Sequence, residues 1–216
     1  MKKKKSEQYF RIAIFGSARI KKGDTRYHLV YDLAKKIAAE GIDIVTGGGP
    51  GLMDAANRGH HAGRRNHRKL KPYSIGLTIQ LQKEQKTSPH LDLKENFSQF
   101  SKRLDEFTLL SNAVVVTPGG VGTTLEFLYT WQLVQVKKIC DVPIILLGEE
   151  WADFLKWVKK WPLKQRLLDE DEMKFLYSAK NCEEAMSIIR QAHETWKRGI
   201  KGICIRYDIK VRKRSS

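Results

Sequence analysis

The sequence has 216 residues, of which 41% are hydrophobic and 30% are charged, and its formal net charge is +16. This size and this balance suit one globular domain with a packed core. The chain has no apolar run of the roughly 20 residues that a membrane-spanning helix needs, and no signal-peptide apolar segment follows residues 1–5. We therefore expect a cytoplasmic protein without a membrane partner.

Strand-like and helix-like apolar patterns alternate along the chain. In chain order they predict a strand at residues 9–15, a helix around residues 30–38, a strand at 42–46, a helix at 52–62, a strand at 73–79, a helix at 99–111, a strand at 113–117, a helix at 123–136, a strand at 143–147 and a helix at 182–197. This alternation is typical of an α/β fold, a Rossmann-like doubly wound parallel sheet with helices on both faces.

The ends of the chain differ from its middle. We expect a basic N-terminal segment at residues 1–8, a single domain at residues 9–199 and a basic tail at residues 200–216. Such positive charge attracts phosphate-bearing partners. No signature of a nucleic-acid module accompanies it, so nucleic acid is only an alternative partner. A further basic stretch at residues 64–71 receives no role from the sequence.

Two glycine-rich loops each follow a predicted strand and open a predicted helix. The first is GGGPGLM at residues 47–53, and the second is PGGVGTTLE at residues 118–126. Ligands of doubly wound sheets bind at such loops, whose free N–H groups can hold a phosphate. Neither loop has the P-loop ending or the dinucleotide spacing, so a mononucleotide fits best. A tight turn without a ligand is the alternative for either loop alone.

Thr123 and Glu126 have two interpretations on spacing alone. They match a capping box, in which the two side chains satisfy the first N–H groups of a helix. A carboxylate beside a phosphate loop is also suited to catalysis. The spacing leaves both interpretations open.

Together the two motifs resemble the LOG family, which comprises cytokinin-activating phosphoribohydrolases and related nucleotide 5′-monophosphate nucleosidases long mislabelled as lysine decarboxylases. The resemblance covers roughly residues 9–160. It implies a homodimeric hydrolase that splits the N-glycosidic bond of a nucleoside 5′-monophosphate, such as AMP or a cytokinin riboside monophosphate, into free base and ribose 5-phosphate. Cytokinin biosynthesis is thus one implied pathway, and no cofactor is expected. The motifs leave the base open.

The resemblance also implies site residues. Alignment without gaps from Pro118 places the family's arginine on Arg103, and the motif glutamate is Glu126; these are the expected catalytic residues. The expected substrate and phosphate ligands are Gly47, Gly48, Gly49, Gly51, Met53, Glu84, Gly119, Gly120, Gly122 and Thr123. No metal site is expected, because His60 and His61 are adjacent and diverge around a helix.

Helical periodicity supports the placement of Arg103. Phe100, Leu104 and Phe107 form an apolar stripe, and Arg103 lies at its edge. A surface salt bridge is the alternative role. Leu104 and Gln132 depart from the family's usual lysine and small hydroxyl residue, which bears on the choice of substrate. Molybdenum-cofactor carriers share the fold and the glycine loops, so a non-catalytic carrier is the competing function; Arg103 and Glu126 together favour the enzyme.

Overall fold

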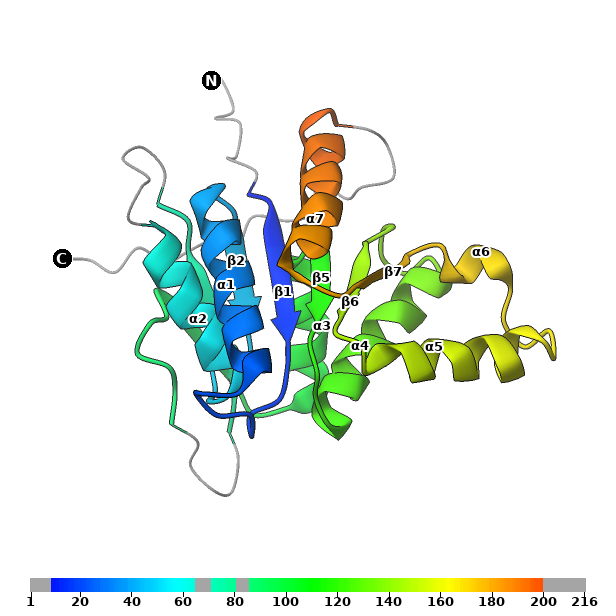
Figure 1. Ribbon diagram of the computed structural model, residues 1–216, viewed down its shortest axis with the longest axis horizontal. Helices are drawn as coiled ribbons and strands as arrows, with labels where there is room; N and C mark the ends of the chain where they lie inside the picture. Colours follow the sequence, from blue (N-terminus) through cyan, green and yellow to red (C-terminus); the bar gives the residue numbers. More distant parts are fainter. Residues whose placement is uncertain (1–8, 65–70, 81–85, 200–216) are drawn as a thin grey trace.

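The structure is a computed structural model that describes residues 9–64, 71–80 and 86–199. Its sheet has seven parallel strands in the order β4-β3-β2-β1-β5-β6-β7 (Figure 1). The strands are β1 (Arg11–Phe15), β2 (Asp43–Thr46), β3 (Ser74–Ile79), β4 (Leu93–Phe97), β5 (Ala113–Val116), β6 (Ile144–Leu147) and β7 (Leu176–Ala179). The helices are α1 (Thr25–Ala39), α2 (Leu52–Gly63), α3 (Phe100–Leu110), α4 (Val121–Gln135), α5 (Trp151–Val158), a π-helix (Lys159–Leu163), α6 (Glu170–Met173) and α7 (Cys182–Lys197).

Helices cover both faces of the sheet, because successive side chains of each strand point to opposite sides. On β1, Ile12 and Ile14 pack into a core with α1, α2 and α7. Ala13 and Phe15 pack into a second core with α3, α4 and α5. The predicted doubly wound fold is therefore confirmed.

The centre of the sheet is its topological switch point. β1 pairs with β2 on one side and with β5 on the other, in register at Ile12↔Ile44 and Ile12↔Ala113. The chain then builds outward in two directions, to β4 and to β7. Parallel strands end at the same edge, so the loops that follow β1, β2 and β5 meet where such folds bind ligands.

All of the predicted strands and helices are present, and α7 has the predicted ends. The strands β4 and β7 at the two edges of the sheet were not predicted. Most of their side chains are exposed, so they lack the apolar pattern of a buried strand. Helix α5 was also missed, although Trp151, Phe154 and Val158 have helical spacing. Residues 1–8 and 200–216 lie outside the described residues.

Candidate active site

Three loops meet at the carboxyl edge of the sheet, and the backbone of Ser17 joins them. The Ser17 N–H donates to the C=O of Pro118 over 3.2 Å, and its C=O accepts from the N–H of Leu52 over 2.8 Å. Gly51 makes this contact possible: its φ is +72°, and a Cβ there would lie 2.2 Å from the oxygen of Ser17. The two glycine motifs and the β1–α1 loop therefore form one unit.

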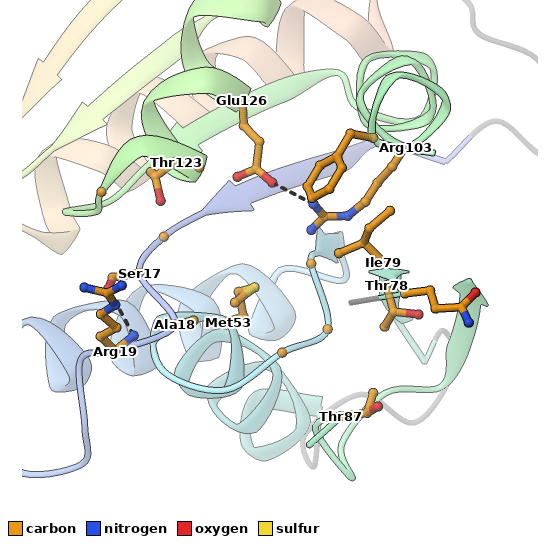
Figure 2. A pocket seen from close by; sticks show the side chains of 18 of the residues that line it. Ser17, Ala18, Arg19, Met53, Thr78, Ile79, Thr87, Arg103, Thr123 and Glu126 are labelled. Atoms are coloured by element: carbon orange, nitrogen blue, oxygen red, sulfur yellow. Dashed lines mark hydrogen bonds and ion pairs between the residues drawn. The ribbon is translucent and has the colours of Figure 1, made fainter. Parts of the chain in front are cut away.

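A cavity of about 850 Å³ opens between these loops (Figure 2). Of the expected site residues, those that line it are Gly47, Gly48, Gly49, Met53, Arg103, Gly120, Gly122, Thr123 and Glu126. Gly51 and Gly119 do not line it. Gly119 instead supports the loop, since a Cβ there would lie 2.2 Å from Oγ1 of Thr123. Glu84 lies outside the described residues.

Arg103 and Glu126 point toward each other and are in contact in the wall of the cavity (Figure 2). Nη1 of Arg103 lies 3.3 Å from Oε1 of Glu126, and the two side chains are only 9% and 13% exposed. The Nε–H of Arg103 donates to the C=O of Leu77 over 2.7 Å, and its Cζ lies 5.1 Å from the ring centroid of Phe107. This ion pair is buried, so the expected alternative of a surface salt bridge is wrong.

Gly47 leaves room for this arrangement. A Cβ on Gly47 would lie 2.4 Å from Nη2 of Arg103 and 2.7 Å from Sδ of Met53. The first glycine motif is therefore in direct contact with the arginine that pairs with the glutamate of the second.

Burial perturbs both charged groups. Loss of hydration raises the pKa of Glu126 to about 7, although the positive charge of Arg103 opposes the rise. Burial likewise lowers the pKa of Arg103, and Glu126 opposes that shift. A carboxyl that titrates near neutral pH in a cavity is suited to proton transfer or to electrostatic stabilisation of a cation.

The N-terminus of α4 forms another part of the cavity wall. The first N–H to bond within this helix is that of Thr124, which donates to the C=O of Gly120 over 3.0 Å. The N–H groups of Val121, Gly122 and Thr123 precede it and can bind an anion. Apart from the adjoining residues and the backbone of α4 itself, no described atom lies within 4 Å of the position of a Cβ on Gly120 or Gly122. A phosphate can therefore approach this backbone closely.

The start of α4 excludes the capping box. The helix begins at Val121 with Gly120 as its N-cap, so Thr123 is its third residue and Glu126 lies in its second turn. Neither position can form the reciprocal bonds of that motif. The sequence pattern matched, but the N-cap of the helix lies three residues before Thr123, so the helix begins too early for the motif.

Phe100 also departs from expectation. Leu104 and Phe107 are buried as predicted, whereas Phe100 is 53% exposed and lines the cavity. It is the first residue of α3, so it lies at the end of the helix rather than along its buried face. The apolar stripe therefore has two core members and one at the cavity.

Sequence analysis missed two parts of the wall. The first is the loop from Gly16 to Arg19; its signal was a strand that stops at a glycine. The second lies beyond β3 and on the unpredicted strand β4, and comprises Thr78, Ile79, Gln80, Thr87, Lys94 and Asn96. Nη1 of Arg64, from the basic stretch of unassigned role, forms an ion pair with Asp92 beside β4 and donates to the C=O of Pro72. Arg64 thus has a structural role.

The position of His60 and the properties of the helices concern two expectations, those for a metal site and for a membrane span. His60 is buried, and its Nε2 lies 2.9 Å from the carbonyl oxygen of Ile42. Within the described residues, no three side chains of His, Cys, Asp or Glu are grouped so that they could hold a metal ion. No helix in the same part of the chain has the length and apolarity to cross a bilayer.

A family model described as "possible lysine decarboxylase" matches residues 53–189, which include Arg103, the whole second motif and the buried glutamate. The chain belongs to this family. The label is the old one of the LOG family, so the resemblance of the two motifs is confirmed. The match begins and ends later in the chain than the motifs indicated.

Individual proteins are similar at lower levels. The pyrimidine/purine nucleotide 5′-monophosphate nucleosidase of Escherichia coli K12 is 27% identical over 137 residues, which are 62% of this chain and 30% of that protein. The molybdenum cofactor binding protein of Rippkaea orientalis has a TM-score of 0.65 at 20% identity, over 86% of this chain and 98% of that one. The molybdenum cofactor carrier protein of Chlamydomonas reinhardtii has a TM-score of 0.62 at 20% identity, over 87% and 99%. The structural likeness concerns the fold.

Proposed function

We propose that this protein hydrolyses the N-glycosidic bond of nucleoside 5′-monophosphates and releases the base and ribose 5-phosphate. The observation that carries the proposal is the buried contact between Glu126 and Arg103 in a cavity that also contains the N-terminus of α4. A buried ion pair is an expensive way to stabilise a fold, and its usual justification in a cavity is function. The nucleosidase of Escherichia coli supports the same reaction class.

Different residues are proposed to bind different parts of the substrate. Of the expected phosphate ligands at residues 119–123, the free N–H groups of residues 121–123 bind the 5′-phosphate, and residues 47–53 approach the ribose and the base. Cleavage of the glycosidic bond develops positive charge on the ribose ring. Ionised Glu126 stabilises that charge and orients the attacking water. Arg103 is always cationic; it holds Glu126 in place and keeps its carboxylate ionised at lower pH than burial alone would allow.

A homodimer belongs to this proposal. Leu125, Leu128 and Val136 expose apolar side chains on or next to α4, a helix that also contributes to the cavity. Exposed apolar side chains on one helix suit an interface with a second copy.

A carrier of the molybdenum cofactor is the second candidate, because solved structures named for that role share the fold. A carrier needs the glycine loops to bind its ligand, but it needs no carboxylate against a developing cation. The Glu126–Arg103 contact therefore favours the hydrolase.

The test is a panel of AMP, GMP, IMP, CMP and UMP, with the matching nucleosides, in which free base is measured by chromatography. The proposal predicts release from at least one monophosphate, with a kcat/KM far above that of its nucleoside, because binding of the phosphate stabilises the bound transition state relative to free enzyme and substrate. Equal rates for monophosphate and nucleoside would contradict the phosphate role of residues 119–123. Binding without release would support the carrier.

A further inference from the structure

The loop after β1 contributes two polar side chains to the cavity. Ser17 and Arg19 line it together with Gly120, Gly122 and Thr123 from the start of α4 (Figure 2). No motif of the sequence assigns a role to this loop. Its place in the cavity is beside the N–H groups that are proposed to bind the phosphate.

The loop is held in a defined position. The backbone of Ser17 bonds to both glycine motifs, at Pro118 and at Leu52. The N–H of Arg19 in turn donates to Oγ of Ser17 over 3.1 Å. Because Oγ of Ser17 accepts this bond, its own proton is available to a ligand. Arg19 therefore extends from an anchored backbone.

The side chain of Arg19 is exposed at the wall of the cavity. Across residues 9–64, 71–80 and 86–199, no carboxylate forms an ion pair with its guanidinium. Arg26, at the start of the next helix, is different: Nη2 lies 2.6 Å from Oδ2 of Asp24, and Nη1 lies 3.9 Å from Oε1 of Glu150. Among the described residues, no side-chain hydrogen bond or ion pair engages the guanidinium of Arg19, which leaves it available to a ligand.

Two sources of positive potential meet at this end of the cavity. One is the N-terminus of α4, and the other is the unpaired guanidinium of Arg19. Both are positive and neither neutralises the other, so an anion that lies between them is stabilised by both. The planar guanidinium can bind two oxygens of a phosphate at once, which a single N–H group cannot do.

We propose that Arg19, assisted by the hydroxyl of Ser17, binds the 5′-phosphate opposite the N-terminus of α4 and sets the preference for phosphorylated substrates. This inference rests on the proposed function, because it assigns a ligand to one end of the same cavity. Arg19 contacts the phosphate equally in the ground state and the transition state. Its contribution therefore appears mainly in KM rather than in kcat.

The experiment compares Arg19→Gln, Arg19→Lys and the control Arg26→Gln. The control removes the same charge from a neighbouring arginine that does not line the cavity. For each protein, kcat and KM are measured with AMP, kcat/KM is measured with adenosine, and the Kd of ribose 5-phosphate is measured by calorimetry.

Arg19→Gln is expected to raise KM for AMP and Kd for ribose 5-phosphate by about 10- to 100-fold, the range of a charge-assisted hydrogen bond. The ratio of kcat/KM for AMP to that for adenosine falls accordingly. Arg19→Lys recovers part of the loss, since it keeps the charge without the planar geometry. Arg26→Gln leaves the ratio unchanged. Equal losses for both substrates, or an unchanged Kd for ribose 5-phosphate, would overturn the assignment.

The two proposals can fail separately. If the wild type releases no base from any monophosphate, the hydrolase is wrong, yet weaker ribose 5-phosphate binding by Arg19→Gln still supports Arg19 as the phosphate ligand. If the wild type is active and Arg19→Gln binds ribose 5-phosphate normally, the hydrolase stands and Arg19 is wrong. If the wild type does not bind ribose 5-phosphate, the assignment of Arg19 is overturned.

Discussion

At the scale of single residues, the charge of Glu126 depends on two opposing influences. Burial raises its pKa to about 7, and the guanidinium of Arg103 lowers it. Arg103 itself stays cationic over the pH range in which proteins are assayed, although burial lowers its pKa. The carboxyl of Glu126 is therefore the member of the pair that changes its charge near neutral pH.

The rate of base release should follow this ionisation. We expect kcat for AMP to reach a plateau above about pH 7 and to fall tenfold per unit below it, because only the carboxylate stabilises a cationic ribose. The measurement uses kcat rather than kcat/KM. The phosphate ester of the substrate has its second pKa at about 6, and its ionisation would change substrate binding and therefore kcat/KM. A kcat that instead falls above pH 7 would mean that the protonated acid is the active form.

Arg103→Gln is the control for this assignment. Removing the guanidinium removes the influence that lowers the pKa of Glu126, so the lower limb of the profile should move to higher pH. An unmoved limb would show that the profile reports another group.

Single residues also mark the limits of sequence reasoning. Arg103 was placed by its spacing from the second motif, and its position at the edge of the apolar stripe correctly indicated that it turns away from solvent. The same stripe wrongly included Phe100 in the core. Spacing could not exclude a capping box at Glu126, because that motif depends on where α4 begins.

At the scale of elements, the loops after β1, β2 and β5 pack through glycine. Gly47 is the position closest to the ion pair, because a Cβ there would lie 2.4 Å from Nη2 of Arg103. Gly47→Ala should displace Arg103 and lower kcat for base release by about 10-fold or more, since small displacements at a reacting centre are costly. Its thermal melt should remain cooperative. Wild-type kcat in Gly47→Ala would show that the close contact with Arg103 is not needed.

The elements that were predicted and those that were missed differ in burial. The inner strands β1, β2, β5 and β6 are mostly apolar and almost wholly buried, so their pattern is strong. In β4, by contrast, Lys94, Glu95 and Asn96 are exposed, and nothing in LKENF distinguishes a strand from a loop. Because β4 was not predicted, the part of the cavity wall that it forms was not predicted either.

At the scale of the whole molecule, the cavity is lined by residues between Gly16 and Glu126, and the basic ends of the sequence lie outside this span. Deleting residues 2–5 and 210–216 should therefore leave turnover of AMP within a few-fold of the full chain. The comparison requires matched melts of both proteins. Lost turnover in a truncated protein with an unchanged melt would assign one of these ends to the site or to a partner subunit.

The site as a whole could be predicted only in part. The two glycine motifs and the proposed catalytic pair came from local sequence and family resemblance. The loop at Ser17 and Arg19 and the wall at β4 join the cavity only through the order of strands in the sheet. That order depends on which strands pair across the switch point, and no short motif records it.

The most direct test of the account is single-turnover release of adenine from AMP by the wild type, by Glu126→Gln and by Glu40→Gln. Glu40 is the matched control, because it also pairs with an arginine, Arg190, but does not line the cavity. We predict that Glu126→Gln releases adenine about 100-fold more slowly, equivalent to about 2.7 kcal/mol, while AMP still raises its melting temperature. Glu40→Gln should match the wild type. Near-wild-type release by a well-folded Glu126→Gln would contradict the catalytic role of Glu126.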